Sequence, residues 1–244
     1  MSADDLTVVI PAFNEASRIV PTLRRVNEYL STQPCSWSVL VVSDGSDDGT
    51  DELVAELAAS DPRFTLVCIS PNQGKGRAVR EGMLRASGDL LLMCDADLAT
   101  PIEELEKLMP RSRDFPVVIG SRPLKESRLE VRQPFHRELL GRSANLLIRA
   151  IGTRGIRDTQ CGFKLFRGEA ARDIFSRCKL NGFSFDVEVL MIARDLGYGV
   201  LEVPIRWAHQ EGSKVSLWRD APRALHDLVM LRVTGRARRV ARRA

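Results

Sequence analysis

The chain has 244 residues, 44% of them hydrophobic and 28% charged, and a formal net charge of only +4, which is the composition of a soluble globular protein large enough to bury a full core. Its five cysteines form no CxxC pair, which argues against a disulfide framework or a zinc site and favours a reducing cytosol as the compartment. No run approaches the roughly 18 apolar residues of a membrane span, and the beginning, MSADDLT, lacks the basic and apolar regions of a signal peptide.

Short apolar runs alternate with longer helix-like segments in the first half of the chain. We predict strands over five of these runs, at residues 7–11, 39–43, 65–69, 90–94 and 116–120. Helices are expected up to Leu30, from near Thr50, from about Gly76 to Ala86, and from Pro101, which suits a first helical turn. This alternation predicts a mostly parallel sheet covered on both faces. Cys68 and Cys94 lie inside apolar runs, so we expect both to be buried.

The second half is less regular. We predict helices over 133–152 and 184–197 and from about Asp220, a strand over 200–207, and a loop entering a strand over 158–166. No internal repeat or low-complexity linker divides the chain. A single α/β domain with a C-terminal elaboration therefore fits the pattern best.

Polar residues directly follow several of the predicted strands. They occupy positions 14–15, 44–48, 72–75 and 95–97. Ligands of open α/β sheets bind outside the carboxyl ends of the strands. These four segments are therefore the candidate site.

Asp95 and Asp97 form the most informative pair. They follow the apolar run 90–94 and are separated only by Ala96. In a turn after the strand, both carboxylates can approach one point, and hard cations such as Mg²⁺ or Mn²⁺ bind carboxylates together with substrate phosphates. The alternative is a pair of acids that only face water in a loop. The position after a buried strand favours the metal site.

The other polar segments each allow two interpretations. In PAFNEASRI, Phe13 could lie against a nucleoside base, or Glu15 could simply favour the N-terminus of a helix. Asp44 could accept a hydrogen bond from a base, whereas the acids that follow it suit helix capping. In NQGKGRA, Lys75 could contact phosphate or remain solvated, and the segment is too short for a Walker loop.

Taken together, the motifs resemble family 2 glycosyltransferases of the GT-A fold, of the dolichyl-phosphate glucosyltransferase and polyprenyl-phosphate sugar synthase type. The motifs are VVIPAFNEA, VVSDGSDDGT, NQGKGRAVREGM, CDADLATPIEEL, IGSR, DTQCGFKLF, FDVEVLMIA and EVPIRWAHQEGSKVS. Each is modest alone, but their order and spacing over about residues 6–234 are specific. The resemblance implies a nucleotide-sugar donor, a divalent metal ion and a polyprenyl phosphate acceptor.

By position, the resemblance implies a role for each matching residue. The donor-binding set would be Pro11, Phe13, Glu15, Asp44, Lys75, Asp95, Ala96 and Asp97. Asp95 and Asp97 would lie at the metal and the diphosphate, with Asp97 as the favoured direct ligand and as a catalytic residue. Arg122, Arg142 and Lys214 would be the other catalytic residues and would meet acceptor or donor phosphate.

Three positions depart from the family pattern. Phe13 stands where the family often has Tyr, so the ring is kept and its hydroxyl contact is lost, and Ser43 replaces a frequent Asp. Ala99 stands where the mannose synthases carry a Gln, which puts a third protein ligand to the metal in doubt. The resemblance therefore favours the glucosyl type, with UDP-glucose as donor.

The implied acceptor is already a strong anion, because a phosphate monoester has a second pKa of about 6. Such an acceptor needs no general base but needs cationic groups that bring two anions together, a task that suits the planar fork of Arg. A cation held by Asp97 would stabilise the charge that builds on the leaving nucleotide diphosphate. In-line attack would invert the sugar and give a β-linked product.

Three alternatives remain open. A polyprenyl-phosphate mannose synthase would take GDP-mannose instead. Transfer to a hydroxyl acceptor would require a base, for which Asp186 and Glu188 are the candidates, although Asp186 is better explained as a helix cap. A nucleotidyltransferase or a non-catalytic nucleotide-sugar-binding protein would share only the α/β pattern.

The domain is expected to span residues 1–234, with a nucleotide-sugar-binding half over about 1–122 and an acceptor-binding half over 123–234. The apolar segment 135–151 is either a core helix or an interfacial helix at head-group depth. The basic tail 235–244 is either a frayed end or an attractant for anionic lipid. We expect a cytoplasmic protein, peripheral on the cytoplasmic face of the membrane, with no nucleic-acid partner.

Overall fold

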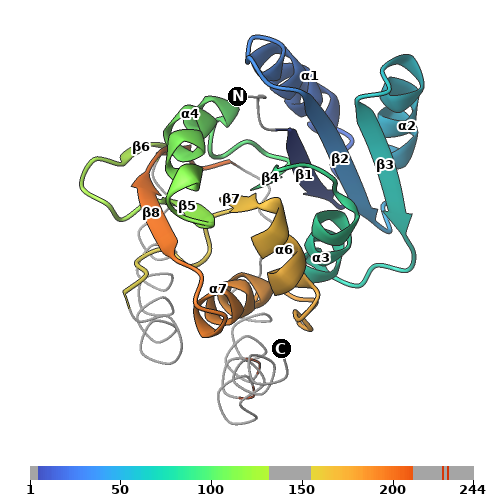
Figure 1. The fold of residues 1–244 in the computed structure, drawn as a ribbon. Coiled ribbons are helices and arrows are strands. Elements are labelled where there is room, and N and C mark those ends of the chain that lie inside the picture. Colours follow the sequence, from blue (N-terminus) through green and yellow to red (C-terminus); the bar gives the residue numbers. More distant parts are fainter. Residues whose placement is uncertain (1–4, 132–154, 211–226, 228–229, 231–244) are drawn as a thin grey trace.

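The computed structural model describes residues 5–131, 155–210, 227 and 230, and these form a central sheet with helices on both faces (Figure 1). Seven strands make the sheet, in the order β3-β2-β1-β4-β7-β5-β8. Their bounds are β1 Leu6–Ala12, β2 Trp37–Asp44, β3 Phe64–Ile69, β4 Leu90–Cys94, β5 Val117–Ser121, β7 Phe163–Arg167 and β8 Val200–Pro204. β6 (Arg128–Val131) and β9 (Arg206–Ala208) pair in a small second sheet.

The sheet is mostly parallel, which confirms the predicted α/β fold class. β1 pairs in parallel with both β2 and β4, and β5 pairs in parallel with β8. β7 is the exception, because it lies antiparallel between β4 and β5. The strand predicted over 200–207 is divided: β8 ends at Pro204, which has no N–H to continue a ladder, and β9 begins at Arg206 in the other sheet.

Helices cover the two faces of the sheet. Those described are α1 Ile19–Leu30, α2 Thr50–Ser60, α3 Lys75–Arg85, α4 Leu105–Leu108, α6 Gly168–Phe175 and α7 Phe185–Asp195. The helix predicted from Pro101 is a broken one, since 3₁₀ turns over Ile102–Glu104 and Met109–Arg113 flank the single turn of α4. No described helix has both the length and the apolar character needed to cross a bilayer.

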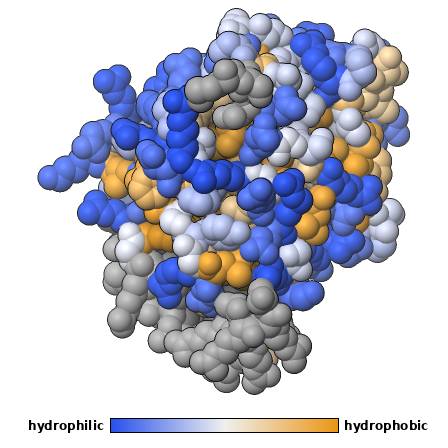
Figure 2. All heavy atoms as spheres, in the orientation of Figure 1, coloured by the Kyte–Doolittle hydropathy of each residue, from blue (hydrophilic) through white to orange (hydrophobic). Residues whose placement is uncertain are grey.

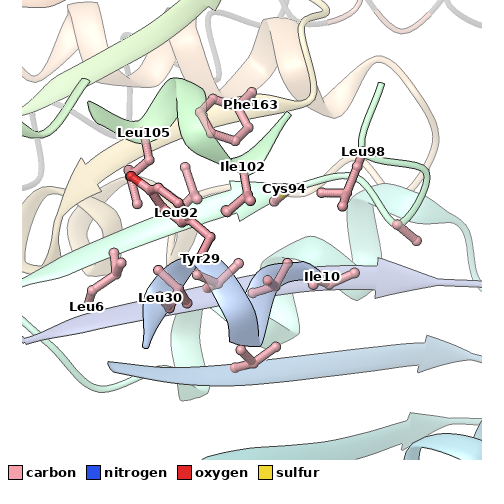
Figure 3. Close-up of a cluster of buried hydrophobic side chains, with 14 of the residues drawn as sticks. Leu6, Ile10, Tyr29, Leu30, Leu92, Cys94, Leu98, Ile102, Leu105 and Phe163 are labelled. Atoms are coloured by element: carbon pink, nitrogen blue, oxygen red, sulfur yellow. The ribbon is translucent and has the colours of Figure 1, made fainter. Parts of the chain in front are cut away.

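Alternation along the strands divides the interior into two cores. Val8 and Ile10 of β1 face one core with α1, whereas Val9 between them packs on the other side with α3. Figure 3 shows the first core, where side chains from α1, β1, β4 and α4 point toward one another. This packing fixes β1 and β4 between helices, so the loops at their carboxyl ends start from rigid positions.

One burial prediction is confirmed and one is wrong. Cys94 in the central strand β4 is buried, but Cys68 is exposed. β3 is an edge strand of the sheet, and its middle residues are only partly covered by α2, so an apolar run there does not imply burial. On the side of the molecule shown in Figure 2, polar and apolar areas are mixed across the described surface.

Candidate active site

The loops after β1 and β2 are joined by hydrogen bonds at the carboxyl edge of the sheet. The Asn14 side chain donates to Asp47 Oδ1 at 2.8 Å and accepts from the Asp47 N–H at 2.9 Å. The Glu15 N–H donates to Thr50 Oγ1 at 2.8 Å, and the Ala16 N–H donates to Asp48 Oδ2 at 2.9 Å. The acids after Asp44 therefore hold the first loop in place rather than project freely into solvent.

The predicted nucleoside-binding residues of the first loop differ in accessibility. The Phe13 side chain is exposed, which is unusual for a large apolar residue directly after a buried strand. Pro11 is buried within β1. The Glu15 carboxylate pairs with Arg18 at 2.8 Å. An exposed ring at the edge of a sheet offers a flat surface on which a base could stack.

Asp44 is buried at the end of β2 and organises the loop before α3. Its carboxylate accepts the backbone N–H groups of Gln73 at 2.9 Å and Gly74 at 2.6 Å. Its own carbonyl accepts from the Asn72 side chain at 2.7 Å. Asp44 therefore joins two of the four candidate segments, and the structure gives it a scaffolding contact that the sequence did not indicate. Its predicted contact with a base stays a prediction.

Asp95 is held between Lys75 and the segment before β7. Its Oδ1 lies 2.6 Å from Lys75 Nζ, and its N–H donates to the Gly162 carbonyl at 3.2 Å. Burial lowers the pKa of Lys75, but the carboxylates of Asp95, Asp186 and Asp97 raise it by more, so this pKa lies above its ordinary value. Lys75 therefore remains a cation at the site rather than a solvated surface charge.

The Asp95 side chain occupies the space that a side chain at position 162 would fill, so this position requires glycine. A Cβ atom at Gly162 would lie 1.9 Å from Asp95 Oδ2, so Gly162→Ala should displace the carboxylate and lower the free energy of unfolding by about 1–3 kcal/mol. Urea unfolding would measure this change. Gly182→Ala is the matched control, because its Cβ would meet no atom within 4 Å, and it should change the free energy by less than about 0.5 kcal/mol. Equal losses in the two variants would contradict the steric argument.

Asp97 lies in a tight turn after β4. Its Oδ1 accepts the Ala99 N–H at 2.9 Å, and the Leu98 N–H donates to the Asp95 carbonyl at 3.2 Å. Burial and then the nearby Asp95 carboxylate raise the pKa of Asp97 above its ordinary value. The turn therefore concentrates negative charge in a partly desolvated place, which a cation would stabilise.

Asp95 and Asp97 suit a hard divalent cation whose remaining ligands come from elsewhere. Among the described residues, no group of three or more His, Cys, Asp or Glu side chains is placed to hold a metal ion alone. Mg²⁺ characteristically binds one or two carboxylates and takes substrate phosphates and waters as its other ligands. The two carboxylates thus fit this kind of site and not a closed protein cage.

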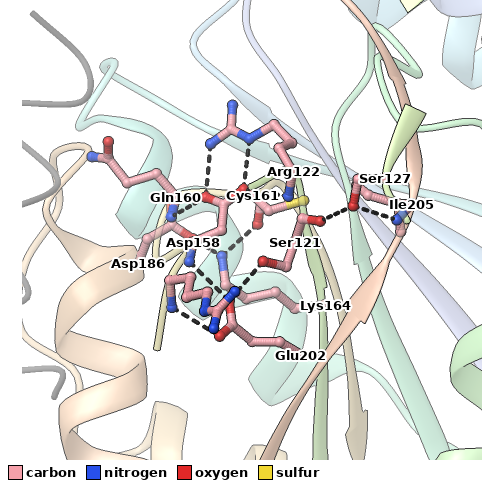
Figure 4. Close-up of polar contacts among 11 residues, drawn as sticks. Ser121, Arg122, Ser127, Asp158, Gln160, Cys161, Lys164, Asp186, Glu202 and Ile205 are labelled. Atoms are coloured by element: carbon pink, nitrogen blue, oxygen red, sulfur yellow. Dashed lines mark hydrogen bonds and ion pairs between the residues drawn. The ribbon is translucent and has the colours of Figure 1, made fainter. Parts of the chain in front are cut away.

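Behind Asp95 lies a buried ion pair that sequence reasoning missed. Lys164 on β7 is fully buried, and its Nζ lies 2.5 Å from both Asp186 Oδ1 and the Cys161 carbonyl (Figure 4). Burial raises the pKa of Asp186, against the opposing effect of Lys164 and Lys75. The sequence did contain a signal for this pair: the lysine in the otherwise apolar segment FKLF. A lysine buried in such a strand must have a buried partner.

Asp186 and Glu188, the candidate bases for a hydroxyl acceptor, are both engaged within the protein. Asp186 pairs with Lys164, and the Glu188 carboxylate accepts the backbone N–H groups of Lys179 at 2.9 Å and Leu180 at 2.7 Å. Both residues are buried. These are the contacts of scaffold residues. The expected helix cap at Asp186 is wrong, because α7 has no side-chain cap hydrogen bond and Asp186 forms a buried ion pair instead.

Arg122 is fixed by Asp158, another residue that the sequence did not single out. Its Nε and Nη2 donate to the two Asp158 oxygens at 2.7 and 2.8 Å, and its backbone N–H donates to Oδ2 at 3.0 Å. The guanidinium carbon lies 5.5 Å from the centre of the Trp207 ring. Glu202 supports Asp158 by accepting its N–H at 2.8 Å. Within the described part of the chain, Nη1 is the guanidinium nitrogen for which no hydrogen bond is seen.

Several predicted features lie outside the described residues. They are Arg142, Lys214, the helix over 133–152, nearly all of the helix from about Asp220, and the basic tail 235–244. The described candidate residues are therefore Phe13, Glu15, Asp44, Lys75, Asp95, Ala96 and Asp97 and, directly after β5, Arg122. Their roles remain predictions.

Comparison with known sequences gives a family match over most of the chain. The profile described as Glycosyl transferase family 2 matches residues 7–175. A dolichyl-phosphate beta-glucosyltransferase of Trichomonas vaginalis is 38% identical over 242 residues, which cover 95% of this chain and 72% of that protein. The proteins of the same description from Saccharomyces cerevisiae and Homo sapiens are 34% and 33% identical, over 93% and 87% of this chain and 74% and 70% of their own.

Solved structures of sugar transferases share the fold. Glucosyl-3-phosphoglycerate synthase from Mycobacterium tuberculosis, in complex with Mn²⁺, UDP and glucosyl-3-phosphoglycerate, superposes with a TM-score of 0.64 at 17% identity, covering 94% of this chain and 80% of that one. Mannosyl-3-phosphoglycerate synthase from Rubrobacter xylanophilus gives 0.63 at 20% identity, covering 96% and 75%. These likenesses confirm the predicted GT-A fold.

Proposed function

The chain belongs to glycosyltransferase family 2, and we propose that it transfers glucose from UDP-glucose to the phosphate of a dolichyl-type polyprenyl phosphate. The observation that carries this proposal is the alignment of dolichyl-phosphate beta-glucosyltransferases with nearly the whole chain at 33–38% identity. Ala99, which stands where the mannose synthases carry a Gln, supports the glucosyl type, because its methyl side chain offers no ligand to a metal ion.

The donor is proposed to lie over the loops after β1, β2 and β4. In this arrangement the exposed Phe13 ring stacks on the uracil, while Glu15 and Asp44 border the nucleoside. Lys75, kept cationic by its carboxylate neighbours, supports the diphosphate side of the site. Aromatic stacking with hydrogen bonds at the rim is the usual way to orient a flat base.

A divalent cation, Mg²⁺ or Mn²⁺, is proposed to be held by Asp97 with Asp95 beside it. The raised pKa of Asp97 and the hard oxygen donors support this role. When bound, such an ion acts as a Lewis acid that stabilises the charge developing on the leaving UDP. Asp95, oriented by Lys75, would order the turn from which Asp97 holds that ion.

The acceptor phosphate is proposed to attack the anomeric carbon in line with the bond to UDP, which inverts the configuration. It needs no proton removed, because the phosphate monoester is already an anion at neutral pH. Arg122, held rigidly by Asp158, would reduce the repulsion between the two anions through its remaining nitrogen. Arg142 and Lys214 are proposed to assist from the acceptor side.

We further propose that residues 123–234 form the acceptor-binding half and that the protein works as a peripheral protein on the cytoplasmic face of the membrane. The apolar segment 135–151 and the basic tail 235–244 would supply the lipid contact. Each arginine close to an anionic surface contributes about 1 kcal/mol of attraction.

Transfer of labelled sugar to polyprenyl phosphate tests the proposal. The purified protein with Mg²⁺ is given UDP-glucose, UDP-galactose or GDP-mannose, and label is counted in the lipid extract. We expect transfer from UDP-glucose with release of UDP. No transfer from any of the three donors would refute the proposal, preferential use of GDP-mannose would make the protein a mannose synthase, and release of pyrophosphate would indicate nucleotidyl transfer.

A further inference from the structure

The turn that carries Asp97 is held from another element, helix α1. The Thr22 hydroxyl donates to the Ala96 carbonyl at 2.6 Å, and both residues are buried. This carbonyl belongs to the peptide unit that joins Ala96 to Asp97. Its direction, together with the hydrogen bond from the Leu98 N–H to the Asp95 carbonyl, fixes how the chain passes through Asp97.

The residue after Asp97 has an unusual backbone conformation. Leu98 has a φ of +45°, in the left-handed region that non-glycine residues rarely adopt. Its side chain is buried in the same core as Ile19 and Leu23, the α1 neighbours of Thr22. Strained backbone of this kind persists where the surroundings over-determine it, and it is concentrated at functional sites. Helix α1 thus holds the turn in two ways, through the apolar core that it shares with Leu98 and through the Thr22 hydroxyl.

Thr22 is an unusual residue for its position in the buried face of α1. It lies inside α1 among residues that are buried and apolar, where a β-branched residue with a hydroxyl neither favours the helix nor gains from burial. The hydrogen bond to Ala96 satisfies this hydroxyl and the buried carbonyl together. This hydrogen bond to the turn that contains Asp97 therefore offsets the free-energy cost of burying the Thr22 hydroxyl.

We infer that Thr22 is a positioning residue for Asp97, acting through the Ala96 carbonyl. The inference rests on the proposed metal role of Asp97. Removal of the hydroxyl leaves that carbonyl buried without a partner, so the peptide turns toward another donor and carries the Asp97 carboxylate with it. Asp95 is held independently by Lys75, so the loss should fall on Asp97. α1 also follows the loop with Phe13, so Thr22 links the base-binding and metal-binding parts of the donor site.

Thr22→Val tests this inference, because valine keeps the shape and removes only the hydroxyl. We expect the dissociation constant for Mn²⁺, measured by the paramagnetic resonance of free Mn²⁺ in the presence of UDP, to rise about tenfold, the lower end of what outer contacts of metal ligands contribute. The kcat/KM for the nucleotide sugar should fall by about the same factor, while the KM for polyprenyl phosphate stays unchanged. Thr22→Ser, which restores the hydroxyl, should bring both values back.

Thr7→Val is the matched control. Thr7 is also a buried threonine whose hydroxyl donates to a backbone carbonyl, that of Ser87, but it lies at the opposite end of β1. Both valine variants should lower Tm by a few degrees, and only Thr22→Val should weaken Mn²⁺ binding. If Thr22→Val does not fold, Thr22→Ala is measured in its place.

The outcomes separate this inference from the proposed function. Unchanged Mn²⁺ affinity in the Thr22 variant, or an equal loss in Thr7→Val, would overturn the positioning role while the metal site stands. Absence of Mn²⁺ binding by the unaltered protein with UDP would overturn the metal role and the inference with it. Weakened binding confined to Thr22→Val and reversed by Thr22→Ser supports the inference.

Discussion

Asp97→Asn should lower sugar transfer by about 10³-fold or more and at the same time raise the Tm of the metal-free protein. The loss follows because a metal ion supplies several kcal/mol of charge stabilisation to the leaving group, and about 1.4 kcal/mol corresponds to a tenfold change in rate. The gain in stability follows because burial and the Asp95 carboxylate raise the pKa of Asp97. Asparagine keeps the oxygen that accepts the Ala99 N–H, so the turn is preserved.

The pH dependence of this gain has a definite sign. A carboxyl group whose pKa is raised on folding binds its proton more tightly in the folded state, so its effect on stability becomes less favourable as the pH rises through the interval between the two values. The lower limit of that interval is the unfolded value of about 3.9. The Tm difference between Asp97→Asn and the unaltered protein should therefore be small below this pH, grow as the pH rises through the interval, and stay constant above it.

Thermal unfolding at several pH values, with and without Mn²⁺ and UDP, checks this prediction. Added Mn²⁺ and UDP should raise the Tm of the unaltered protein more than that of Asp97→Asn. Asp89→Asn is the matched control, because Asp89 is an exposed acid next to the opposite end of β4, and it should leave both activity and Tm unchanged. An Asp97→Asn variant with full activity, or one less stable at neutral pH without metal, would contradict the assignment.

Local pattern was sufficient to predict most of the fold. The run 90–94 is β4 with the predicted bounds, and α3 differs from its prediction by one residue at each end, because an apolar run and the residues that bound it are read within a short window. The antiparallel direction of β7 and the break after Pro204 were not predicted. Both depend on which distant strand a segment joins, and the pattern of the segment itself does not contain that information.

For the site, too, the sequence predicted the local features and not the contacts between distant residues. The loops were predictable because they follow strands whose carboxyl ends share one edge. Lys75 was recognised only as a residue that either contacts phosphate or is solvated, and its pairing with Asp95 depends on a contact across 20 positions of sequence. Asp158 and Lys164 were missed for the same reason: both lie in the motif DTQCGFKLF, but their roles are set by the distant partners Arg122 and Asp186.

Asp186→Asn should lower the free energy of unfolding by about 3–5 kcal/mol, because it leaves the ammonium group of Lys164 buried without a counter-charge. Lys164 is fully buried and lies 2.5 Å from Asp186 Oδ1. Urea unfolding at neutral pH measures the loss. Asp61→Asn is the matched control, since Asp61 forms an exposed ion pair with Arg63 at 2.7 Å, and exposed pairs contribute no more than about 1 kcal/mol.

Replacing both partners distinguishes a scaffold from a catalytic base. In the double variant Lys164→Met, Asp186→Leu no buried charge is left unpaired, so most of the lost stability should return. Transfer to polyprenyl phosphate should then stay within about tenfold of the unaltered protein, because the proposed acceptor is already ionised and needs no base. A general base contributes about 10²–10⁴-fold. A stable double variant with a loss of that size would show that Asp186 acts on the acceptor, and would reinstate transfer to a hydroxyl group.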